Sequence, residues 1–240
     1  MNMRRPARLA ALAIALAIAG GMTAHAADEP RVRVTTSLGS FVIELNPERA
    51  PLTVENFLRY VREGHYTNTL FHRVIANFVI QGGGITPEYT TRPAHDPIPN
   101  ESGNGLQNLR GAVGLARAAG PHTGDAQFFV NVGNNADLDP LPTRWGYAVF
   151  GKVVEGMDVV DRISVQPTGA VATLKSDAPL KPVIIQNVTL IGGAPAEITL
   201  PEITPGVAAS PTAPAQPAEA PADAESPAGS TEPPAEPPGQ

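Results

Sequence analysis

The chain has 240 residues, of which 42% are hydrophobic and 17% charged, and it contains 26 Pro and no Cys. Disulfide scaffolds, thiolate metal sites and cysteine nucleophiles are therefore excluded. Residues 28–191 carry 14 Lys and Arg against 16 Asp and Glu, so this part lacks the clustered basic face that nucleic acid or an anionic membrane requires. We expect a peptide or small polar partner and no nucleic acid.

Residues 1–26 have the pattern of a secretory signal peptide. Three arginines precede an apolar run over residues 9–19, and Ala24 and Ala26 are small residues at the two positions that a signal peptidase reads. A run of 11 apolar residues is about half of the ~20 that a membrane-spanning helix needs, which favours a cleaved leader over an anchor. We predict that the processed protein is periplasmic in a bacterium with two membranes and does not insert into the membrane.

Residues 192–240 are predicted to form a disordered acidic tail. They contain twelve Pro and seven acidic residues but no aromatic residue and no Lys or Arg. Such a segment cannot bury enough apolar surface to offset the entropy lost on ordering. The alternative roles for this segment are a spacer, a docking strip, or a ligand for another domain or for the groove of its own chain.

Residues 27–191 are predicted to form one domain rich in β-strands. Apolar and polar residues alternate over 31–36, and residues 41–45 follow a Leu38-Gly39 turn, which is the pattern of a hairpin. Residues 82–110 are rich in Gly, Pro and Asn without periodicity, and we expect them to form a long functional loop. Six further apolar runs have strand length: residues 70–75, 78–81, 112–116, 127–132, 147–153 and 183–190.

Two helices are predicted among these strands. After Pro51, apolar residues recur at i, i+3, i+4 and i+7, which predicts an amphipathic helix that Gly64 ends in a left-handed conformation. A second helix is predicted over residues 157–163, after Gly156. Many short strands with two isolated helices favour an antiparallel barrel or sandwich over a parallel sheet.

Several chemistries are excluded because their motifs are missing. No histidine forms a metal-ligand pair with a nearby carboxylate, and Gly82-Gly83-Gly84 is not followed by the Lys and Ser or Thr of a phosphate-binding loop. No G-x-S-x-G motif supplies a nucleophilic serine. We expect no metal, no cofactor and no covalent intermediate.

An arginine, aromatic rings and two glutamines stand among strands that otherwise favour apolar residues. Because side chains alternate along a strand, Val79 and Gln81 share one face, and so do Gln127 and Phe129. These side chains are predicted to meet Arg73 on a single surface. The alternative is that the aromatic residues belong to the core and that Arg73 pairs with a carboxylate.

The most specific pattern lies in four segments. They are Phe71-His72-Arg73, Phe78-Val79-Ile80-Gln81-Gly82-Gly83, Ala126-Gln127-Phe128-Phe129-Val130-Asn131 and Tyr147-Ala148-Val149-Phe150-Gly151-Lys152-Val153. In this order they resemble the cyclophilin family of peptidyl-prolyl cis-trans isomerases, most closely its secreted bacterial members. The resemblance implies an all-β fold, a closed eight-stranded antiparallel β-barrel capped by two α-helices, with the substrate groove on its outer surface. It also implies isomerisation of X-Pro bonds in proline-containing peptides and unfolded exported proteins.

The same resemblance implies roles for individual residues. Arg73 corresponds to the catalytic arginine of the family. Phe78, Phe129 and Leu138 correspond to walls of a pocket for the proline ring, and Gln81 and Gln127 correspond to polar contacts with the peptide. The full set of implied substrate contacts is Phe78, Val79, Gln81, Ala116, Arg117, Gln127, Phe129, Leu138 and Tyr147.

Three single residues and one two-residue turn depart from the family pattern. Val79 replaces a common Met, which keeps the wall apolar but makes it shorter and stiffer. Arg117 replaces the usual Asn in the stretch that binds the substrate backbone. Asp137 replaces an aromatic residue, and this difference concerns cyclosporin binding more than catalysis. Ala76-Asn77 replaces a Pro-Gly turn, and Asn tolerates the left-handed conformation that such a turn requires.

The departures at Val79, Arg117 and Asp137 motivate a second hypothesis for the function. A peptide-binding module or holdase chaperone would keep the groove but lose turnover, in contrast to a periplasmic isomerase that speeds the folding of exported proteins. We expect a monomer in either case, because the sequence has no heptad pattern and no exposed apolar strip.

Overall fold

The computed structural model describes residues 29–192. The predicted signal peptide, residues 1–26, lies outside the described residues, as does the predicted tail, residues 192–240, apart from Gly192, which is the last residue of a strand. Within the described range, no helix is long and apolar enough to cross a membrane.

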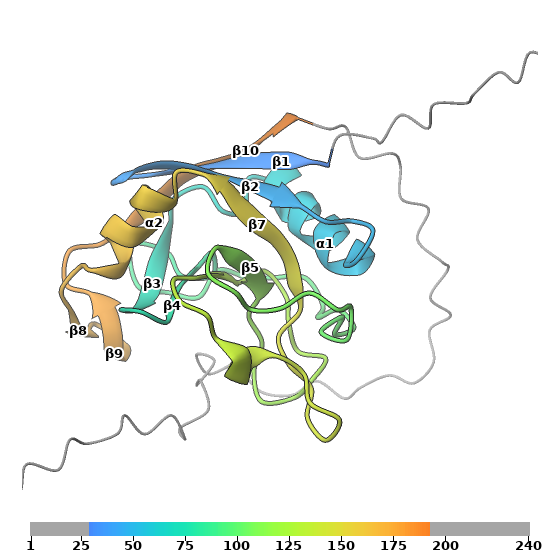
Figure 1. The fold of residues 1–240 in the computed structure, drawn as a ribbon. Helices are drawn as coiled ribbons and strands as arrows, with labels where there is room; N and C mark the ends of the chain where they lie inside the picture. Colours follow the sequence, from blue (N-terminus) through green and yellow to red (C-terminus); the bar gives the residue numbers. More distant parts are fainter. Residues whose placement is uncertain (1–28, 193–240) are drawn as a thin grey trace, which may run out of the picture.

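Eight strands close into an antiparallel barrel in the order β1-β10-β3-β4-β6-β5-β7-β2 (Figure 1). They are β1 (Arg31–Thr36), β2 (Gly39–Leu45), β3 (Thr69–Ile75), β4 (Val79–Gly82), β5 (Ala112–Leu115), β6 (Phe128–Asn131), β7 (Val149–Glu155) and β10 (Ile184–Gly192). β1 and β2 form the predicted hairpin. The predicted eight-stranded barrel is confirmed, and each barrel strand begins and ends within two residues of its expected bounds.

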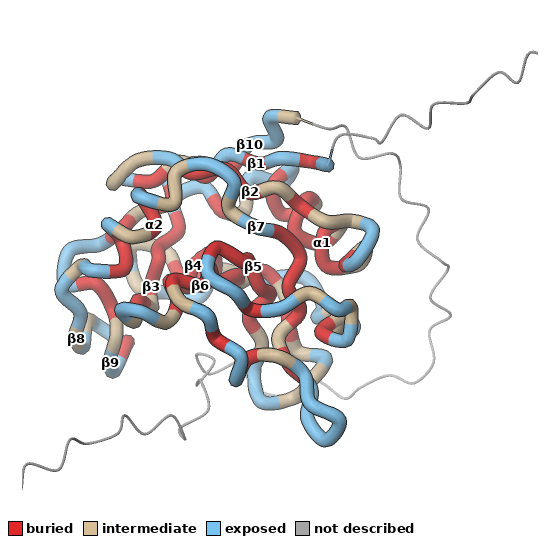
Figure 2. The backbone as a smooth tube through the Cα atoms, viewed as in Figure 1, coloured by how far each residue is buried: buried red, intermediate tan, exposed pale blue. Residues whose placement is uncertain are grey.

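The core fills the inside of the barrel because side chains alternate along each strand. In β1, Val32 and Val34 are fully buried while Arg31 and Arg33 are exposed. Figure 2 shows buried segments along the barrel strands and exposed segments in the connecting loops. The largest buried strand side chains are aromatic: Phe41, Phe71, Phe128 and Phe150.

Helix α1 (Pro51–Arg62) covers one end of this core. It begins at Pro51, whose fixed φ and missing N–H suit the first turn of a helix. The Phe57 ring is buried, with its centroid 5.6 Å from that of Phe128 and 5.1 Å from that of Phe150. The chain leaves the helix through Gly64 at a φ of +68°, as the sequence predicted.

Helix α2 (Met157–Ser164) covers the barrel from another side, and Figure 1 shows the two helices apart from each other around it. Its N-cap, Gly156, has a φ of +76°. A Cβ at Gly156 would lie 2.5 Å from the backbone oxygen of Ser40, so only glycine fits where β7 turns into α2. Both predicted helices are confirmed.

A small sheet outside the barrel was not predicted. It pairs β8 (Thr168–Val171) with β9 (Leu174–Pro179), and β9 packs along β3. These strands escaped prediction because they are short, polar and lack apolar alternation. The long loop between β4 and β5 was predicted, and its described residues contain only isolated bridges, at Ile85 with Thr91 and at Ile98 with Gly124.

The packing of α1 predicts a large cost for truncating its central aromatic residue. Phe57→Ala should lower the free energy of unfolding by about 3–5 kcal/mol, because it leaves a cavity between helix and barrel. Chemical denaturation followed by circular dichroism measures this change. Leu180→Ala is the control, because Leu180 is 55% exposed and its truncation should cost less than about 0.5 kcal/mol. Equal losses in the two variants would contradict the described packing.

Candidate active site

The candidate site is a row of residues that crosses four neighbouring strands on the outer face of the barrel. Arg73 of β3 pairs with Gln81 of β4, Gln81 pairs with Phe129 of β6, and Phe129 pairs with Gly114 of β5. Ile80 and Val130, next to these residues in sequence, lie in the barrel core. The row therefore faces outward, on one surface as the alternation of residues in β4 and β6 predicted, and on the outer surface as the family resemblance implied.

Arg73 reaches this outer face through an irregularity in β3. The pairing register shifts between Phe71 and Arg73, so Phe71 and Val74 both enter the core although they are three residues apart. Strict alternation from Phe71 would have turned Arg73 inward. A bulge of this kind is a common means of re-aiming a side chain at a functional site.

The polar part of the row is a chain of hydrogen bonds between side chains. Arg73 Nη1 donates to Gln81 Oε1 over 3.4 Å, and Gln81 Nε2 donates to Gln127 Oε1 over 3.1 Å. Gln127 lies directly over Gly84, where a Cβ would come within 2.5 Å of Gln127 Cγ. The predicted meeting of both glutamines with Arg73 is confirmed, and Gly84 is a supporting residue that the sequence analysis missed.

An apolar pocket adjoins this polar chain. Four of its residues are buried together on the outside of the barrel, separate from the main core: Val79, Ala116, Phe129 and Leu138. Phe78 and Tyr147 pack against them and are partly exposed. The Phe129 ring lies over Gly114, where any Cβ would overlap the ring. The predicted pocket residues are thus brought together, and Gly114, which makes room for the ring, was not foreseen.

The Arg73 guanidinium is partly buried and has no ion-pair partner among the described residues. Burial lowers its pKa from the ordinary value of arginine, and the charge of Asp177 on β9 opposes this effect from beyond ion-pair distance. Its Cζ lies 5.9 Å from the centroid of the Phe78 ring. The alternative in which Arg73 pairs with a carboxylate is therefore wrong for the described part of the chain, and its donors remain available to a ligand.

Arg117 is held within the protein. Its Nη2 donates to Trp145 O over 3.0 Å and its Nε donates to Gly146 O over 3.2 Å, while its Cζ lies 4.5 Å from the centroid of the Tyr147 ring. Nη1 donates to Ala118 O over 3.0 Å. Ala116 lines the pocket as expected, whereas the guanidinium of Arg117 joins two loops beside it.

A buried network of amides supports two walls of the pocket. Asn135 Nδ2 donates to Phe78 O over 2.9 Å and to Asn131 Oδ1 over 2.7 Å. Asn131 in turn donates to Asn108 Oδ1 over 3.2 Å. Asn135 is also the N-cap of the 3₁₀ helix that carries Leu138. The sequence analysis missed this network, although the concentration of Asn between residues 131 and 135 was its one visible signal.

The turn before Phe78 has the conformation that the sequence predicted. Asn77 has a φ of +59°, which lies in the left-handed region. Asp137, in contrast, is exposed on the 3₁₀ helix and its backbone oxygen accepts a hydrogen bond from Arg144 Nη2. Its side chain adds no apolar wall to the pocket.

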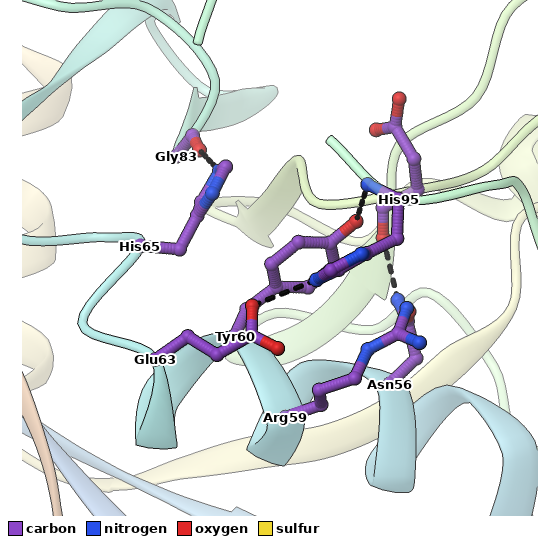
Figure 3. A network of polar contacts seen from close by, with 8 residues as sticks. Asn56, Arg59, Tyr60, Glu63, His65, Gly83 and His95 are labelled. Carbon is purple, nitrogen blue, oxygen red and sulfur yellow. Dashed lines mark hydrogen bonds and ion pairs between the residues drawn. The ribbon is translucent and has the colours of Figure 1, made fainter. Parts of the chain in front are cut away.

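Helix α1 anchors the loops around the site through polar contacts (Figure 3). His65 Nε2 donates to Gly83 O over 3.1 Å, at the end of β4. Tyr60 Oη accepts a hydrogen bond from His95 N over 2.8 Å, and His95 Nε2 donates to Glu63 over 2.7 Å. The long loop is therefore fixed to the last turn of α1 and to Glu63 just after it, and the end of β4 is fixed to His65 in the turn that follows the helix. Among the described residues, no three His, Asp or Glu side chains gather as they would around a metal ion.

Comparison with known proteins identifies the family. The model of the cyclophilin-type peptidyl-prolyl cis-trans isomerase family matches residues 31–190. Peptidyl-prolyl cis-trans isomerase cyp18 of Streptomyces antibioticus is 50% identical over 164 residues, covering 67% of this chain and 98% of that protein. Peptidyl-prolyl cis-trans isomerase B of Escherichia coli is 48% identical over 158 residues, covering 65% of this chain and 96% of that protein.

The same fold occurs in a solved cyclophilin. The crystal structure of a Cryptosporidium parvum cyclophilin-type isomerase, determined in the presence of the dipeptide Ala-Pro, has a TM-score of 0.56 and 28% identity. It covers 68% of this chain and 99% of that chain. The present chain belongs to the cyclophilin family. Its activity is that of a peptidyl-prolyl cis-trans isomerase, so the predicted family and enzyme class are confirmed.

The contact between Gly114 and Phe129 predicts a loss of activity when a methyl group is added. Gly114→Ala should displace the ring and lower kcat/KM for an X-Pro peptide roughly 10- to 100-fold, since small displacements at a catalytic site have effects of this size. Gly103→Ala is the matched control, because a Cβ there meets no atom within 4 Å. Wild-type kcat/KM in Gly114→Ala would contradict the assignment of the pocket.

The His72 side chain, next to Arg73, predicts a pH dependence of stability. Burial lowers the pKa of its imidazole from 6.5 to about 4, so the unfolded chain binds the proton more tightly than the folded one. The free energy of unfolding should therefore fall as pH drops from 6.5 to 4, by up to about 3 kcal/mol from this residue. Denaturation across this range should show a shallower slope for His72→Gln, and identical slopes would refute the prediction.

Proposed function

We propose that Arg73 carries the catalysis by donating hydrogen bonds to the prolyl nitrogen of a twisted X-Pro amide. Rotation of the amide has an uncatalysed barrier of about 18–20 kcal/mol because resonance is lost on the way. In the twisted state the prolyl nitrogen becomes pyramidal and gains a lone pair. A hydrogen-bond donor lowers the barrier if its bond to the pyramidal nitrogen of the twisted amide is stronger than its bond to the nitrogen of the planar amide.

This proposal rests on the surroundings of the Arg73 guanidinium. Arg73 is partly buried, faces outward beside an apolar pocket and has no carboxylate at ion-pair distance among the described residues. Among the residues that the structure describes, its guanidinium makes one hydrogen bond, the long one to Gln81. An arginine suits the role because it keeps its charge and presents several fixed donors.

The pocket would hold the proline ring while the rest of the peptide turns. Phe129, Val79 and Leu138 form an apolar surface that suits the apolar proline ring. The close contact with Gly114 fixes the Phe129 ring. Gln81 and Gln127 are fixed by their mutual hydrogen bond, so they would bind the neighbouring peptide backbone at little entropic cost. The Ala-Pro dipeptide of the C. parvum structure is the simplest ligand of the class proposed here.

We further propose that the clients are exported proteins that fold in the periplasm. The support is the signal-peptide pattern of residues 1–26. X-Pro isomerisation takes tens of seconds and limits the folding of many chains. Exported chains fold after crossing the membrane, so a catalyst of this step is useful in that compartment. A monomer suffices for this role, because every proposed contact comes from one chain.

The mechanism predicts a specific effect of removing the guanidinium. A charge-assisted hydrogen bond contributes about 1.5–3 kcal/mol, so Arg73→Ala should lower kcat/KM roughly 10- to 150-fold while the fold is kept. Exchange between cis and trans forms of a short X-Pro peptide, followed by NMR, measures the rate. Arg33→Ala is the control, because Arg33 is exposed on β1, outside the site.

The same experiment separates catalysis from binding alone. Near-wild-type turnover in Arg73→Ala would refute the proposed mechanism. Peptide binding by the wild-type chain without any acceleration would instead indicate a peptide-binding module or holdase chaperone.

A further inference from the structure

The loop that joins two pocket residues exposes large apolar side chains. It runs from Leu138 to Tyr147, and it carries Leu141 at 55% exposure and Trp145 at 49%. In Figure 1 this loop projects away from the barrel in yellow-green. Trp145 is the one tryptophan of the chain. Contiguous exposed apolar surface marks an interaction site, and both side chains lie in the loop that begins and ends at pocket residues.

The backbone of this loop is held in place. Leu141 and Arg144 exchange two backbone hydrogen bonds, of 2.9 and 3.0 Å. Gly146 N donates to Ser102 Oγ over 3.2 Å, and Gly146 O accepts from Asn100 Nδ2 over 3.0 Å. The exposed Trp145 ring is therefore presented on an ordered support, which lowers the entropy that a ligand would have to remove.

Trp145 is connected to the proline pocket through Arg117. The Arg117 guanidinium bonds to the backbone of Trp145 and lies over the Tyr147 ring, 4.5 Å from its centroid. Tyr147 meets Phe129 edge to face, with centroids 5.8 Å apart. On its other side, the Trp145 ring meets His122 edge to face at 5.2 Å. Phe129, Tyr147 and the Arg117 guanidinium therefore form a contiguous stack, and Arg117 ties this stack to the backbone that carries the exposed indole.

We infer that Trp145 and His122 form a subsite for an aromatic or large apolar side chain of the substrate peptide. The occupant is a residue near the X-Pro bond, and the inference rests on the proposed binding of proline at Phe129. Trp145 lies two residues before Tyr147, so their Cα atoms are at most about 7 Å apart, and the Tyr147 ring centroid lies 5.8 Å from that of Phe129. The subsite is therefore within a few residues of the bound proline along an extended peptide, at about 3.3 Å per residue. Arg117, which replaces the usual Asn, acts as a positioning residue for this subsite.

The test compares three X-Pro peptides on the full chain. One peptide has Ala at all flanking positions, one has Phe three residues before Pro, and one has Phe three residues after Pro. We expect kcat/KM to be roughly 2- to 12-fold higher for one of the Phe peptides than for the Ala peptide, as expected for an aromatic contact. Trp145→Ala should abolish this ratio and leave kcat/KM for the Ala peptide within twofold. Val165→Ala, a variant of a residue that is 71% exposed outside the site, should keep the ratio.

Several outcomes would overturn the subsite. These are an unchanged ratio in Trp145→Ala, no preference for either Phe peptide, or an equal loss for the Ala and Phe peptides. A concentration-dependent shift of Trp145 fluorescence without peptide would assign this surface to a second copy of the chain instead.

A measurement of peptide binding, made without turnover, distinguishes a failure of the subsite from a failure of the proposed mechanism. In Arg73→Ala, the preferred Phe peptide should still shift the Trp145 emission, with a Kd within about twofold of wild type. A shift without turnover in the wild-type chain would refute the mechanism and leave the subsite standing. No shift in a wild-type chain that turns the peptide over would refute the subsite alone.

Discussion

The outward position of Arg73 depends on the register shift in β3. A closed barrel has an interior that only apolar side chains can fill, and an unpaired guanidinium there would cost several kcal/mol. The shift lets Phe71 and Val74 both enter the core while Arg73 faces out beside Gln81. The other residues of the row, Gln81, Phe129 and Gly114, reach the same face through regular antiparallel pairing of β4, β6 and β5.

The site combines this fixed charge with groups that cannot move far. Gln81 and Gln127 hold each other, Gly84 and Gly114 leave space for their neighbours, and the buried amides fix Phe78 and the 3₁₀ helix. Groups fixed before the ligand arrives need no reorganisation during the reaction. In the proposed mechanism, partial burial of Arg73 strengthens the hydrogen bonds that its guanidinium donates, because a hydrogen bond is stronger in a low dielectric. Burial also lowers the pKa of Arg73, and the charge of Asp177 on β9 opposes this lowering.

The sequence predicted what depends on local pattern. The hairpin, the helix that ends at Gly64, and the shared faces of β4 and β6 follow from periods of two and 3.6 residues. The β8–β9 sheet, the amide network and the contacts of Arg117 were not predictable in this way. They join residues such as Asn108 and Asn131, or Arg117 and Trp145, that are far apart in sequence and whose types are equally common in unordered loops.

Closure of the barrel also bears on how this protein would meet the unfolded chains that we propose as its clients. A sheet with a free edge presents unpaired N–H and C=O groups that can pair with an extended chain and seed aggregation. In the described residues, every barrel strand has a partner on both sides. Only the small β8–β9 sheet keeps open edges, and these strands are short, with an exposed Lys175. To the extended clients proposed above, the protein thus offers a row of side chains but almost no backbone template for joining its own sheet.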